Sequence, residues 1–87
     1  MPEISRFYGV IIYMYLKDHM PPHFHAVFAE YEAMFSIETG EIIQGDIPKS
    51  QLRIVQAWTE LHREELKRNF ELLTSENASY FKIEPLH

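Results

Sequence analysis

Residues 18–25 read Asp18-His19-Met20-Pro21-Pro22-His23-Phe24-His25 and separate two apolar segments of the chain. The two consecutive prolines lack backbone N–H donors, and they disfavour helical conformation in the residue before them. Lys17–Pro22 is therefore predicted to be a loop between two strands. Three of the five histidines of the chain also lie in this stretch, beside an acidic residue. An ordinary turn needs no such set of side chains, so the stretch is a candidate site.

The segments around this loop are rich in β-branched and aromatic residues and are too short or too alternating for an amphipathic helix. Val10–Leu16 is predicted to be a central strand covered on both faces, after an extended piece at Arg6–Tyr8. Polar and glycine-containing turns separate the segments that follow. Further strands are expected at His23–Ala29, Glu32–Ile37 and Glu41–Gln44.

A single long helix is predicted at 48–74, with Pro48 as its first residue, where the missing N–H costs nothing. Its apolar residues project onto one stripe that covers the sheet. The helix would span about 40 Å, whereas a domain of this length is about 30 Å across. Either it bends near His62, or its last turns project and bury Phe70 and Leu73 against a second copy or a partner protein.

The last alternating segment, Tyr80–Glu84, is expected to add a short edge strand that ends at Pro85. The predicted fold class is therefore α+β: an antiparallel meander of four to five strands packed against one long helix in the C-terminal half. At 87 residues, 1–87 is expected to form one domain.

Strand alternation places His23 and His25 on one face of their strand and turns Phe24 to the core. Two imidazoles at this spacing can converge on one divalent metal ion, with His19 or Asp18 from the loop as a third ligand. No cofactor other than this ion is indicated by the sequence.

A metal-free alternative uses the same histidines as a general acid and a general base, for example in RNA cleavage or another hydrolysis. The candidate catalytic residues are then His19, His23 and His25, with a phosphate held by Arg6, Lys17 or Tyr13.

A third interpretation assigns the stretch no chemistry. The prolines stiffen a connection between strands, Asp18 and His19 bond to nearby backbone, and His23 and His25 pack against an aromatic ring such as Tyr13 or Tyr15. This interpretation is compatible with a surface that binds a partner.

The composition narrows the function classes. The chain has no cysteine and a net charge of −5, so it has no disulfides or thiolate zinc site, and a broad nucleic-acid-binding face is disfavoured. It contains no apolar run of the roughly 20 residues needed to span a bilayer, and no signal-peptide pattern. A cytoplasmic protein without membrane association is therefore expected.

The proline–histidine motif, together with Ile4-Ser5-Arg6-Phe7-Tyr8-Gly9, Gly45, Pro48 and Trp58, resembles the bacterial domain of unknown function 4160 over nearly the whole chain. The resemblance implies a small stand-alone protein that pairs with a neighbouring small protein, in the manner of toxin–antitoxin systems, and it implies no catalytic residue. We therefore expect a small binding or regulatory module acting through protein–protein association at the helix end. The alternative is a histidine-based enzyme that uses Asp18–His25.

Overall fold

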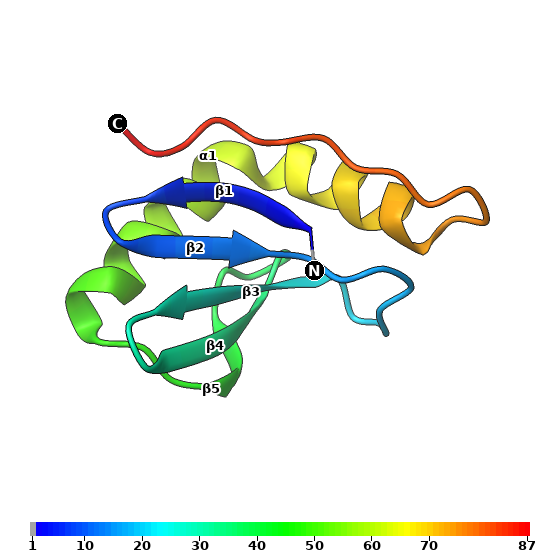
Figure 1. Ribbon diagram of the computed structural model, residues 1–87. Helices are drawn as coiled ribbons and strands as arrows, with labels where there is room; N and C mark the ends of the chain where they lie inside the picture. The colour runs from blue at the N-terminus through cyan, green and yellow to red at the C-terminus, as the bar shows by residue number, and fades with distance from the viewer. Residues whose placement is uncertain (1) are drawn as a thin grey trace.

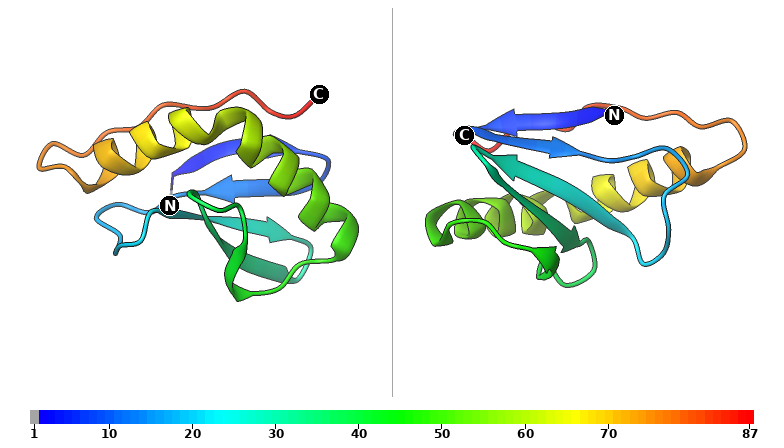
Figure 2. Two further views of the ribbon diagram at one scale, coloured as in Figure 1. Left: turned by 180° about the vertical axis from the view of Figure 1, so that it is seen from behind. Right: turned by 60° about the horizontal axis from the view of Figure 1, so that its bottom comes forward.

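The computed structural model describes residues 2–87, which form one antiparallel sheet with a long helix across one of its faces (Figures 1 and 2). The five strands lie side by side in chain order. This arrangement confirms the predicted α+β meander. The strands are β1 (Glu3–Phe7), β2 (Val10–Tyr13), β3 (His23–Phe28), β4 (Tyr31–Ser36) and β5 (Ile42–Gly45).

Two-residue turns join β1 to β2 and β3 to β4, whereas residues 14–22 connect β2 to β3. Tyr8 and Gly9 join β1 to β2 with φ angles of 48° and 80°, the left-handed conformation that tight hairpins require. Ala29, with φ of 53°, begins the equally short turn between β3 and β4. Because such turns leave no room for a crossover, the two strands that each turn joins must pair with each other.

The second strand is shorter than predicted, since β2 ends at Tyr13 and not at Leu16. Tyr13 is the last residue of β2 that pairs with both neighbours, with Glu3 on β1 and His25 on β3. Beyond it the chain leaves the sheet for the end of the helix, where the backbone N–H of Lys17 donates to Leu73 O at 3.0 Å. Residues 14–22 therefore form one long loop.

The core lies between the sheet and α1 (Lys49–Thr74). Trp58 on α1 is fully buried, and its ring centroid lies 5.2 Å from that of Phe7 and 5.8 Å from that of Phe24. Phe24 in turn stacks on Phe35 of β4 at 5.3 Å. The Phe24 face of β3 is thus the core face, as predicted, and His23 and His25 point to the other side.

The helix bends and does not project. Residue His62 has non-helical dihedral angles, φ −120° and ψ 22°, within α1. Phe70 and Leu73, beyond the bend, are buried in the core of the protein itself. The prediction that they form a projecting apolar end is therefore wrong. Pro48 lies just before the helix and not in its first turn. No helix within residues 2–87 is both long enough and apolar enough to cross a membrane.

The predicted C-terminal edge strand is not formed. Residues 78–87 run in an irregular extended path along α1 and beside β1 (Figure 1), with one backbone bond to the sheet, from Ile83 N to Ile4 O. Side chains of the helix bond to further backbone groups of this tail. The Asn69 amide pairs with both N and O of Phe81, and Trp58 Nε1 donates to Glu84 O. A tail bonded to a helix in this way has few groups left for a strand ladder.

Candidate functional site

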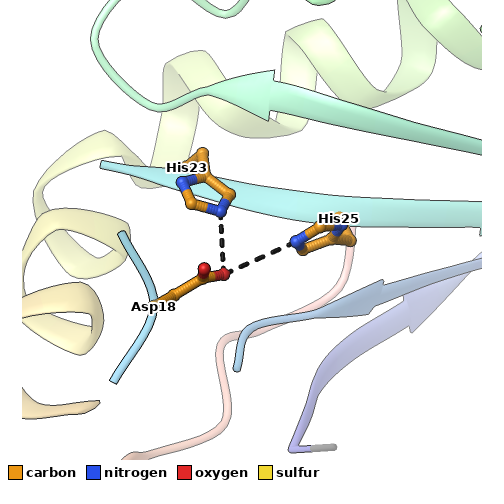
Figure 3. Close-up of side chains that lie close together, drawn as sticks. All are labelled: Asp18, His23 and His25. Carbon is orange, nitrogen blue, oxygen red and sulfur yellow. Dashed lines mark hydrogen bonds and ion pairs between the residues drawn. The ribbon is translucent and has the colours of Figure 1, made fainter. Parts of the chain in front are cut away.

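The 14–22 loop folds back over β3 and brings Asp18 to the two histidines of that strand (Figure 3). Asp18 Oδ2 lies 2.8 Å from His23 Nε2 and 3.6 Å from His25 Nε2. One ligand atom from each of the three side chains lies within 4.8 Å of the others. We call this cluster of Asp18, His23 and His25 the triad.

Both ring nitrogens of His23 face oxygen acceptors. Nδ1 lies 2.7 Å from Pro21 O, and Nε2 lies 2.8 Å from the Asp18 carboxylate. A neutral imidazole carries one N–H, so it satisfies only one of these acceptors. A neutral His23 therefore leaves one of the two oxygens without a donor, and a metal ion at Nε2 would remove this mismatch.

The environment of His25 leaves one nitrogen without a hydrogen bond. Its Nε2 is buried and has no hydrogen-bond partner, although it points at the same carboxylate oxygen as His23 (Figure 3). On the other side of the ring, Nδ1 lies 3.5 Å from Glu32 Oε2. The ring of Tyr15 packs edge-on against the imidazole at 4.3 Å between centroids. His25 is thus held in place with Nε2 directed into the triad.

The pKa values of Asp18 and His25 are both lowered, but by different causes. Burial opposes ionisation of Asp18, but the backbone N–H of His19 and the His23 ring outweigh it and hold the pKa of Asp18 below its ordinary value. Burial, with a further contribution from His23, lowers the pKa of His25. At neutral pH the triad therefore contains a carboxylate and a neutral His25.

Contacts at both ends hold the loop in place. At its start, Lys17 bonds to Leu73 O through its backbone and to Ser75 O through Nζ, both at the end of α1. At its end, Pro22 O accepts a bond from Ile37 N at 3.1 Å. Within it, His19 N donates to Asp18 Oδ1 at 2.9 Å. These bonds aim the Asp18 carboxylate at the histidines.

Two residues proposed from the sequence stay outside the cluster. His19 is exposed and is not one of the side chains whose ligand atoms converge. Arg6 pairs with Glu3 on β1, with bonds of 3.1 and 2.8 Å, and β2 separates that strand from β3. The structure therefore brings together Asp18, His23 and His25 out of the predicted candidates.

Two partners of the triad were not predicted from the sequence. Glu32 faces His25 because the register pairs it with Val27, which shares a strand face with His25. The alternation of side chains along the two strands and the short turn between them were the sequence signals for this position of Glu32. Glu32 also lines an open depression of about 330 Å³ beside His25, together with Met34, Gln44 and Gly45. The carbonyl of Pro21 has no signal in the sequence, since its direction depends on the path of the loop.

Comparison with known proteins identifies a family without an assigned activity. Neither a curated protein nor a solved structure matches the chain significantly. The sequence model of one family, described as a domain of unknown function (DUF4160), matches residues 9–71, which include the whole triad. The chain therefore belongs to the DUF4160 family.

Proposed function

We propose that this protein binds one divalent metal ion through the triad and that this centre is its functional site. The observation that carries the proposal is the buried, unpartnered Nε2 of His25. A buried polar atom without a partner costs about 1–3 kcal/mol. An ion between His25, His23 and Asp18 removes this cost and takes the place of a proton at His23 Nε2.

The spacing of the donor atoms suits such an ion. Ligands bound at about 2.1 Å in a tetrahedron around zinc lie roughly 3.4 Å apart. The distances from Asp18 Oδ2 to His23 Nε2 and to His25 Nε2, 2.8 and 3.6 Å, lie on either side of this value. All three donor atoms lie within 4.8 Å of one another, so side-chain rotations that bring the two imidazole nitrogens closer would place them around one ion.

Contacts behind the donor atoms support the same interpretation. Histidines that bind metals usually donate their other N–H to a carbonyl or a carboxylate, which orients the ring. His23 has Pro21 O as a hydrogen-bond partner in this position, and the Glu32 carboxylate faces His25 Nδ1 at 3.5 Å. With two imidazoles, one carboxylate and no thiolate, the donor set suits zinc, nickel, iron(II) or manganese more than a soft metal.

Zinc binding by the purified protein tests the proposal. Isothermal titration is expected to show one zinc ion per chain, and His25→Ala to weaken this affinity by roughly 100-fold, at least as much as loss of an orienting partner does. His19→Ala is the matched control: it removes an exposed imidazole from the same loop and leaves the backbone bond to Asp18 intact. Its zinc affinity is expected to equal that of the wild type.

Two outcomes would contradict the proposal. One is the absence of bound zinc, nickel and manganese in elemental analysis, with no change in melting temperature when these ions are added. The other is an equal loss of affinity in His19→Ala and His25→Ala, which indicates adsorption to surface histidines. Circular dichroism spectra of the variants verify that each remains folded.

Association with another protein is a second candidate function, and the 14–22 loop is the surface that favours it. Leu16 and Met20, on either side of Asp18, are 58% and 74% exposed. Exposed apolar surface is a common feature of interaction sites. This surface replaces the helix end suggested by the sequence, and it suits the toxin–antitoxin-like pairing implied by the family resemblance.

Sedimentation velocity over a range of concentrations tests this surface. The sedimentation coefficient is expected to rise with concentration, because burial of Leu16 and Met20 against a second copy removes apolar area from water. Met20→Glu is expected to abolish the rise. Leu61→Glu is the control, since Leu61 is 68% exposed but lies on α1. A monomer at every concentration, or equal effects of both variants, would count against self-association through this loop.

A further inference from the structure

We infer that the metal ion in the triad keeps at least one coordination position open, and that this position takes water or a small anion with an oxygen or nitrogen donor atom. The inference rests on the proposed metal binding. It concerns what the site does once loaded, and it follows from counting the donor atoms that the protein offers.

Each side chain of the triad has one free donor atom. Asp18 Oδ1 accepts the backbone N–H of His19 at 2.9 Å, and Oδ2 is the oxygen that faces both histidines. His23 Nδ1 is bonded to Pro21 O, and only Nε2 faces the triad. His25 Nδ1 is directed to Glu32, which leaves Nε2. Asp18 therefore acts as a monodentate ligand, and the triad supplies three atoms in total.

Three donor atoms do not complete the shell of any metal that suits this set. Tetrahedral zinc takes four ligands, and structural zinc sites obtain all four from the protein. Manganese and iron(II) in octahedral geometry take more. Within residues 2–87, no further histidine, aspartate or glutamate converges with Asp18, His23 and His25. At least one position is therefore left to a ligand from solvent.

Burial limits the size of that ligand. The side chains of His23 and His25 are 4% and 11% exposed, whereas that of Asp18 is 19% exposed. Solvent therefore reaches the cluster past the loop that carries Asp18. The nearby rings of Tyr15 and Phe70 occupy space around the two imidazoles. A ligand of a few heavy atoms fits such an opening, and a bulky one does not.

Charge selects an anion. A divalent ion bound by two neutral imidazoles and the Asp18 carboxylate keeps a net charge of +1. The next carboxylate, Glu32, faces the far nitrogen of His25, and its side chain is 57% exposed, so the high dielectric constant of the nearby water weakens its interaction with the ion. The open position therefore attracts hydroxide and small anions. Three protein ligands with one exchangeable position is the arrangement of catalytic zinc sites, in which the ion activates water.

Cobalt(II) in place of zinc tests the inference, because its visible absorption reports the number and type of its ligands. Cobalt added to the wild-type protein is expected to produce absorption bands that saturate at one ion per chain. Azide is then expected to change their wavelength and intensity, with saturation at one azide per cobalt. Perchlorate at the same ionic strength is expected to leave the bands unchanged, and His19→Ala to respond to azide as the wild type does.

The outcomes separate the two proposals. If cobalt bands form and azide leaves them unchanged, the ion is fully coordinated by the protein; the inference is then wrong, and metal binding by the triad stands. If cobalt produces no bands in the wild type, the proposed metal site fails and the open position with it. An equal response to perchlorate and azide also overturns the inference, because it shows an effect of ionic strength and not a ligand.

Discussion

Replacing Trp58 by alanine is expected to lower the free energy of unfolding by about 4 kcal/mol, within the range for deleting a buried aromatic ring. Trp58 is fully buried between α1 and the sheet and packs against Phe7 and Phe24. Its Nε1 also donates to Glu84 O at 2.8 Å and holds the C-terminal tail. The substitution therefore removes contacts that join the helix, the sheet and the C-terminal tail. Urea denaturation followed by far-ultraviolet circular dichroism measures the loss.

Trp58→Phe separates packing from the hydrogen bond. Phenylalanine keeps a ring against Phe7 and Phe24 but leaves the carbonyl of Glu84 without its donor, so a loss of about 1–2 kcal/mol is expected. Equal losses for Trp58→Phe and Trp58→Ala would contradict the assignment of the larger share to packing. Zinc affinity is expected to remain in Trp58→Phe, because the residue does not contact the triad.

Replacing Gly45 by alanine is expected to cost about 3 kcal/mol or more, the second of the large effects on stability. Gly45 has a φ of 80°, and a left-handed conformation costs a residue with a side chain about 1–2 kcal/mol. A Cβ at this position would also overlap the backbone oxygen of Glu32 and lie 3.3 Å from Ala33 Cα. Strand β4 would have to move, and backbone in a sheet yields only at a high cost.

Gly40→Ala is the matched control for Gly45→Ala. Gly40 has nearly the same φ, 77°, but a Cβ there would meet its nearest neighbours, the ends of Arg63 and Thr59, at 3.8 and 3.9 Å. Only the conformational cost of about 1–2 kcal/mol is expected. Thermal unfolding of both variants measures the difference, which is due to the clash with β4. Equal destabilisation of the two variants would contradict the prediction, because it would show that the clash with β4 adds nothing to the cost of Gly45→Ala.

Local signals in the sequence predicted an antiparallel meander, whereas the structure gives the order of its strands. Alternating residues in β3 and β4 indicated which face is buried, and the short turn between these two strands favoured an antiparallel pair. The apolar stripe of α1 predicted the helix to within one residue. These signals depend on a residue and its immediate neighbours, so they are readable without coordinates.

The tail was predicted wrongly, and for the helix the sequence left a bend near His62 and a projecting end as alternatives, because long-range partners decide both features. Residues 80–84 alternate as a strand does, but Asn69 and Trp58 bind their backbone groups first. Phe70 and Leu73 would project from a straight helix, but the irregular dihedral angles at His62 return them to the core. The periodicity of a sequence does not show whether a backbone group will bond to a neighbouring strand or to a side chain that the fold brings near it.

The sequence by itself determined that His23 and His25 share one strand face and that Phe24 turns to the core, because side chains alternate along any strand. It did not determine whether Asp18 or His19 reaches them, since adjacent residues of a loop point in different directions. Only the tertiary structure decides this. Bonds from Lys17 to the end of α1 orient the loop, turn the Asp18 carboxylate inward and leave His19 exposed. The triad therefore depends on a contact between residues more than fifty positions apart.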